Sequence, residues 1–189
     1  MDLAEIAVAA ALAWGAGLRA YAVIFLTGLA GAPGWVELPS HLRLLEHPLV
    51  LGASGFMSAV EFFADKLPWL DSVWDAVHSF IRIPAGAALA AAVFGDAGGA
   101  LALAAAILGG TLAAGTHLAK AGTRAALNTS PEPLSNWGAS LAEDAMVPAG
   151  LWLAVAHPVV FFALLAAFLV AAALLVRLIW RGLRNLLRA

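Results

Sequence analysis

The chain has 189 residues and a mass of 19.4 kDa, is 63% hydrophobic and 12% charged, and has a mean hydropathy of +0.92. The charged fraction is about half of that usual in soluble domains, which leaves too few polar side chains to cover a water-exposed surface and excludes a soluble globule. The net charge of −2 argues against a nucleic-acid partner, and the absence of cysteine excludes disulfides and thiolate metal sites. The composition predicts an all-α, polytopic helical membrane protein that forms a single transmembrane domain over residues 1–189.

Long apolar segments, separated by glycine, proline and polar residues, predict about six transmembrane helices. The first is interrupted at Trp14–Arg19, where two glycines and an arginine fall inside the apolar run. Helix starts are expected at Asp71–Ser72 for the third span and at Ser130–Pro131–Glu132 for the fifth. Pro84, which should kink the third span, and Pro148 in the fifth are expected to act as hinges. The expected spans cover roughly residues 3–30, 48–66, 71–94, 98–127, 130–156 and 159–180.

The arginines at the end of the chain indicate its orientation. Arg177, Arg181, Arg184 and Arg188 follow the last span, and the positive-inside rule places such clusters in the cytoplasm. An even number of spans would place the N-terminus there as well. We therefore expect a multi-pass protein of the bacterial cytoplasmic (inner) membrane with both termini in the cytoplasm.

Two helical hairpins resemble each other and suggest an internal repeat. Pro68–Trp74 and Pro131–Trp137 share their Pro, Ser and Trp positions, and Pro84–Gly86 has a counterpart in Pro148–Gly150. The sequence therefore predicts two Pro-kinked hairpins, at about 48–94 and 98–156.

Ionisable residues recur at helical spacing in four consecutive spans. In the third, Asp71, Asp75, His78 and Arg82 share a face about 60° wide. Lipid offers charged groups no partners, so these stripes are expected to face one another in a polar core. The residues expected to line a substrate or ion pathway are Arg19, Glu61, Asp75, His78, Arg82, His117, Lys120, Arg124, Asn136, Glu143 and Asp144.

The charges of this core do not balance. Six carboxylates (Glu61, Asp65, Asp71, Asp75, Glu143, Asp144) stand against five cations (Arg19, Lys66, Arg82, Lys120, Arg124), which leaves one excess negative charge if both core histidines are neutral. Protonation of a carboxylate, charging of a histidine or binding of a cation would each meet that excess.

Several of these residues have alternative interpretations. Asp75 and His78, one helical turn apart, are candidate ligands for a divalent metal ion, and no other cofactor is expected. Asp65–Lys66, Asp71 and Glu132 are most simply interfacial or capping residues, and Arg82 with Glu143 or Asp144 could form a fixed ion pair.

Four strings in the chain are long enough to be specific: Ala64–Pro68, Asp71–Arg82, Pro84–Ala87 and Asn128–Trp137. Together they resemble the bacterial membrane family catalogued as domain of unknown function 4126, over nearly the whole chain. The resemblance implies the membrane class and the importance of the two hairpin loops, and it supplies no catalytic residues.

These observations favour a small transporter or channel-like protein that moves a cation, a proton or a small polar solute through the polar core. Two alternatives stay open: an intramembrane metal-dependent enzyme acting on a lipid-like substrate, and a non-catalytic membrane assembly subunit. The expected partners are membrane lipids, the transported ion or solute and a second copy of the chain, with no nucleic acid.

Overall fold

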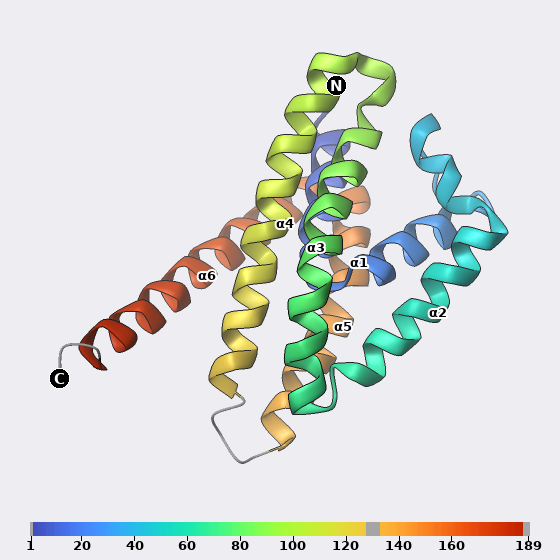
Figure 1. The fold of residues 1–189 in the computed structure, drawn as a ribbon. Helices are drawn as coiled ribbons and strands as arrows, with labels where there is room; N and C mark the ends of the chain where they lie inside the picture. The colour runs from blue at the N-terminus through green and yellow to red at the C-terminus, as the bar shows by residue number, and fades with distance from the viewer. Residues whose placement is uncertain (1, 128–132, 187–189) are drawn as a thin grey trace.

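The regular secondary structure of the chain is helical throughout the part that the computed structural model describes, residues 2–127 and 133–186. The predicted all-α class is therefore confirmed. In chain order the elements are α1 (Leu3–Gly31), the 3₁₀ helix η1 (Ser40–Glu46), α2 (Pro48–Ala64), α3 (Pro68–Val93), the 3₁₀ helix η2 (Gly95–Ala97), α4 (Gly99–Leu127), α5 (Pro133–Ala156) and α6 (Pro158–Leu186) (Figure 1).

Local sequence signals account for several helix boundaries. Asp2 and Glu5 form a reciprocal capping box at the start of α1. Prolines occupy the first turns of α2 and α3, where the missing backbone N–H is tolerated. Gly98 separates η2 from α4 with a φ of 108°, a conformation that favours glycine.

Five of the described helices, α1, α3, α4, α5 and α6, are long and apolar enough to cross a membrane. The predicted second span, α2, has 17 residues and is shorter than the about 20 that a bilayer requires. The helix start expected at Asp71–Ser72 is wrong, because α3 begins at Pro68 and places Asp71 inside its first turn rather than at its cap. The start expected at Ser130 lies outside the described residues.

The central element of the bundle is α1, which contacts each of the other five α-helices and carries the longest run of buried residues. Figure 1 shows α3 and α4 running side by side with α5 behind them, while α2 and α6 diverge from this group on opposite sides. The N-terminus and the C-terminus lie at opposite ends of the bundle in this view. The expectation that both termini are cytoplasmic stays a prediction.

Small residues allow α1, α3 and α4 to approach closely. A Cβ atom added at Gly17 would lie 2.4 Å from the Ala113 carbonyl oxygen, and one at Gly109 would lie 2.5 Å from the Ala90 Cβ and 2.9 Å from the Gly86 carbonyl oxygen. Such contacts are typical of membrane helices that pack through glycine and alanine. They fix α4 against α1 at the level where the charged side chains of α4 begin.

Candidate functional site

A break in α1 lies at the centre of the polar core. Arg19 has φ −148° and ψ 83° within an otherwise helical segment, and it is 2% exposed. The part of α1 that follows the break leaves the α3–α4 pair and runs toward α2 (Figure 1). The break frees the Leu18 carbonyl, which accepts a hydrogen bond of 3.3 Å from Lys120 Nζ. The break at Arg19 falls on the last residue of the interruption predicted at Trp14–Arg19.

Lys120 is the cation that joins the parts of the core. Its Nζ lies 2.9 Å from Asp65 Oδ2, 3.3 Å from Asp75 Oδ1 and 3.3 Å from Glu143 Oε2. Its side chain is completely buried. One ammonium group therefore connects carboxylates from the α2–α3 turn, from α3 and from α5.

On the α2 and α3 side, Arg82 is held between two acids and a histidine. Its guanidinium donates to Glu61 Oε1 at 2.7 Å and to Asp75 Oδ1 at 2.5 Å. It also contacts His117 Nδ1 at 3.2 Å, while His117 Nε2 lies 2.6 Å from Ser79 Oγ, which donates to the Asp75 carbonyl. This chain of donors assigns the ring proton of His117 to Nε2 and holds the imidazole neutral.

On the α4 and α5 side, Arg124 is likewise held between several acceptor groups. Its Nε and Nη2 donate to the two carboxylate oxygens of Glu143 at 3.3 and 3.0 Å. Its Nη1 donates to the side-chain and backbone oxygens of Asn136 and to the Asp65 carbonyl, and lies 3.8 Å from Asp71 Oδ2. Bidentate pairing of this kind fixes the geometry of both groups.

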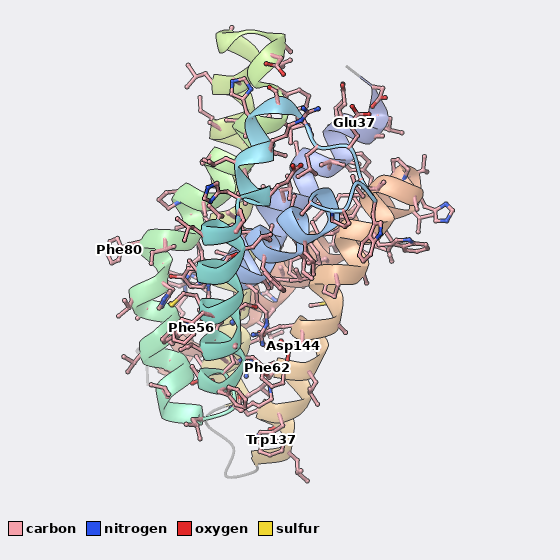
Figure 2. All side chains as sticks on the ribbon, turned by 90° about the vertical axis from the view of Figure 1, so that its right-hand side faces the viewer. Glu37, Phe56, Phe62, Phe80, Trp137 and Asp144 are labelled. Carbon is pink, nitrogen blue, oxygen red and sulfur yellow. The ribbon has the colours of Figure 1, made fainter. Side chains whose placement is uncertain are left out.

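A third branch reaches the edge of the core through Asp144. Arg19 Nη2 lies 2.9 Å from Asp65 Oδ2 and 3.0 Å from Asp144 Oδ1, and Lys66 Nζ lies 3.5 Å from Asp144 Oδ2. The same Lys66 ammonium is 3.0 Å from the centroid of the Phe62 ring. Figure 2 shows Phe62 and Asp144 close to each other between α2 and α5. Asp144 is 22% exposed, so this branch is the part of the network that lies nearest to the surface.

The two network residues in the turn between α2 and α3 have shifted pKa values. Burial opposes ionisation of Asp65, but the attraction of Lys120 and Arg19 outweighs it and holds the pKa of this carboxyl below its ordinary value. Burial lowers the pKa of Lys66, and the nearby Asp144 offsets only part of that effect. Asp65 is therefore maintained as an anion at the centre of the network.

All eleven charged residues counted in the core from the sequence belong to one connected network of ion pairs shorter than 4 Å. Each cation has a carboxylate partner, and the carboxylates exceed the cations by one. In the described part of the chain, three buried carboxylate oxygens have neither a hydrogen-bond partner nor an ion-pair contact: Glu61 Oε2, Asp65 Oδ1 and Asp75 Oδ2. The excess charge predicted from the sequence is thus accompanied by unfilled acceptor positions.

The profile of the family described as Domain of unknown function (DUF4126) matches residues 6–178. The chain belongs to this family. No curated protein and no solved structure matches it. The match spans every residue of the buried network, so the network lies within the DUF4126 domain.

The proposed metal pair of Asp75 and His78 does not come together in this DUF4126 chain. The Asp75 carboxylate faces Arg82 and Lys120, whereas the His78 ring stacks on Trp74 at 4.0 Å and its Nδ1 donates to the Trp74 carbonyl at 2.8 Å. The described residues contain no group of three His, Asp or Glu side chains placed to hold a metal ion. His78 is instead part of an aromatic cluster that includes Tyr21.

The proposed hinge prolines lie away from the network. Pro84 and Pro148 are exposed, and α3 and α5 continue through them. Within the described residues, non-helical backbone angles inside an α-helix are found at Arg19. A hinge at either proline stays a prediction.

Four network contributors were not predicted as site residues. Asp65, Lys66 and Asp71 were expected at the interface or at a cap, but Asp65 and Asp71 are fully buried and all three are ion-paired. Ser140 also contributes, since its hydroxyl and carbonyl oxygens accept hydrogen bonds from Arg19. The available signal was helical spacing, because Asp65 lies four residues after Glu61 on the same stripe.

Proposed function

We propose that this DUF4126 protein is a small proton-linked membrane transporter whose buried ion network carries one exchangeable proton. The observation that carries the proposal is the surplus of one carboxylate in a network that is otherwise fully paired. An unpaired buried carboxylate is strongly unfavourable in a low-dielectric interior, so such a group takes up a proton or a cation.

A proton suits this network better than a divalent metal ion. The unfilled oxygens belong to Glu61, Asp65 and Asp75, and each of these carboxylates already binds an arginine or a lysine through its other oxygen. The described residues supply no three-ligand metal group. Intramembrane carboxylates paired with basic groups are typical of proton relays.

The interruption of α1 supports a transport role. Broken helices in the middle of a membrane bundle are a common feature of transporters, since the freed backbone groups bind charges and the two halves can move separately. Here the break places the Leu18 carbonyl and the Arg19 guanidinium in direct contact with the network.

We infer that the C-terminus is cytoplasmic in the inner membrane. Arg177, Arg181 and Arg184 lie in the last turns of α6, Lys66 follows the end of α2, and Arg124 lies in the last turn of α4. The C-terminal ends of these three helices point to the same end of the bundle in Figure 1. The N-terminus is then on the outer side. In this orientation α2–α3 and α4–α5 each run inward and then outward, as a parallel repeat of two hairpins requires.

One observation favours a non-catalytic assembly subunit instead. Every cation of the network has a carboxylate within 4 Å, as expected where charges serve only to fix helix packing. A purely structural network would bind no exchangeable proton, so proton movement separates the two functions.

The proposal is tested in liposomes that enclose a pH-sensitive dye. A pH gradient with a clamped potential should drive proton flux above that of protein-free liposomes. Glu61→Gln makes carboxylates and cations equal in number and should reduce the flux to background, whereas Glu37→Gln, far from the network and 93% exposed, should not (Figure 2).

Infrared spectroscopy of the purified protein provides a second measurement. The band of a protonated buried carboxyl group should be present in the wild type and in Glu37→Gln and should disappear in Glu61→Gln and in Asp75→Asn. Background flux together with no such band in the wild type would contradict the transporter proposal and support the assembly subunit.

A further inference from the structure

An apolar groove leads to the network from the side of the bundle. It has a volume of about 290 Å³ and is lined by α4, α5 and α6, together with Leu18 of α1. Its walls are formed mainly by alanines of these helices, with Met146, Phe168 and Leu175. The groove is partly open, and α4 and α6, which contribute to its lining, are apolar helices long enough to cross a membrane.

The charged residues in the lining of the groove are Lys120 and Glu143. Their charged atoms are 3.3 Å apart, and the Lys120 side chain is fully buried while that of Glu143 is 8% exposed. A molecule lying in the groove would therefore meet the Glu143 carboxylate before the Lys120 ammonium.

The contacts of Lys120 allow Glu143 to accept another partner. Lys120 also binds Asp65 and Asp75, and the second oxygen of each of these carboxylates has no hydrogen-bond partner. An ammonium that gave up its contact with Glu143 would therefore stay paired with Asp65 and Asp75. Glu143 would keep its Arg124 contact at 3.0 Å and gain room for a second cation.

The charge of the network determines which headgroup fits. A monovalent cation at Glu143 cancels the surplus negative charge, whereas an anion would raise the imbalance to two charges next to a carboxylate. The apolar walls require that the rest of the molecule be hydrophobic. The shape and the charge together describe an amphipathic monovalent cation.

We propose that this groove is the binding site for amphipathic monovalent cations, with the apolar body between α4 and α6 and the cationic head on Glu143. The inference rests on the proposed function, since it names the substrate class of the same network. The cation and the proton would compete for one surplus negative charge, so binding of the cation should release the proton.

Matched single-chain amphipaths test the inference in phosphatidylcholine nanodiscs. Octyltrimethylammonium should raise the melting temperature of the protein, followed by tryptophan fluorescence, whereas octanol and octyl sulfate at the same concentration should not. Glu143→Gln should weaken the apparent affinity for the cation about tenfold or more, as expected for loss of a charge-assisted contact.

A matched pair in α6 separates groove binding from effects of the bilayer. Ala172→Phe fills the groove and should abolish the response, while Ala173→Phe places the same side chain at an exposed neighbouring position outside the lining and should preserve it. An equal response to all three amphipaths would identify the occupant as any lipid chain and overturn the inference. A cation response that persists in Ala172→Phe would also overturn it.

Proton release in weakly buffered solution separates the two proposals. Specific binding of octyltrimethylammonium without proton release would support the groove site and contradict the exchangeable proton. Proton flux in liposomes without a specific response to the cation would support the transporter and overturn the groove site.

Discussion

At the residue scale, the charge balance of the buried network depends on Lys120. Its side chain is buried and contacts carboxylates on three chain segments. Its ammonium also donates a hydrogen bond to the Leu18 carbonyl, which the break in α1 leaves free. Removing a member of a buried ion pair is far more harmful than removing an exposed charge, because the remaining partner stays desolvated and unpaired. The loss of stability on removing Lys120 should therefore be much larger than the loss on removing an exposed cation, and the two can be compared by unfolding.

Lys120→Met should lower the free energy of unfolding by about 3–5 kcal/mol, since three carboxylates lose a shared cation and the surplus rises to two charges. The measurement is denaturant unfolding of the protein in detergent. Arg43→Met removes a cation that is 60% exposed and 3.8 Å from Glu37, and it should change stability by less than about 1 kcal/mol. Equal effects of the two substitutions would show that the network does not stabilise the fold.

Helical spacing predicted most residues of the network from the sequence. Glu61 and Arg82 lie on predicted stripes, and their contact follows from the alignment of those stripes in a lipid environment that offers no other partners. Asp71 was misassigned because α3 begins at Pro68, which turns a predicted cap into a buried side chain. The periodicity of the sequence cannot detect that a helix starts three residues earlier, yet this shift decides which groups a carboxylate contacts.

At the element scale, glycines set the distance between helices. Gly109 and Gly115 lie in the same helix, α4, but differ in surroundings: a Cβ at Gly109 would clash with α3, whereas a Cβ at Gly115 would meet nothing within 4 Å. Alanine is a better helix former than glycine, so a glycine-to-alanine substitution should stabilise the helix unless the added methyl group clashes with a neighbouring helix.

Gly115→Ala should therefore be neutral or stabilise by up to about 1 kcal/mol. Gly109→Ala should destabilise by about 1–3 kcal/mol, because α3 and α4 must move apart to admit the methyl group. Thermal unfolding of both variants in the same detergent provides the comparison. A gain in stability for Gly109→Ala would mean that the close contact between α3 and α4 is absent in solution.

At the scale of the whole molecule, the count of crossings fixes the sidedness of the chain. Six full crossings would bring both termini to one side, but α2 is short, α1 is broken, and the termini lie at opposite ends of the bundle (Figure 1). The orientation proposed above requires an odd number of crossings. The broken α1 and the short α2 follow each other in sequence, so this part of the chain would account for the odd number.

Introduced cysteines test the orientation, since the chain has none of its own. Leu3→Cys, at the N-terminal end of α1, should react with a membrane-impermeant maleimide in intact cells, whereas Arg184→Cys should react only after the cells are permeabilised. Both positions are exposed, so differences in labelling report the side of the membrane. Labelling of both positions under the same condition would contradict opposite termini.

The sequence by itself determined the membrane class, the helical content, the polar stripes and the charge imbalance, because these follow from composition and from a repeat of 3.6 residues. Only the tertiary structure decided that Asp65 lies at the centre of the network, that Asp75 and His78 face different partners, and that α6 leaves a groove above Glu143. Periodicity identifies which side chains share a helix face. The contacts of those side chains depend on the rotation and divergence of neighbouring helices, and on the break at Arg19, which are fixed by packing between segments distant in the chain.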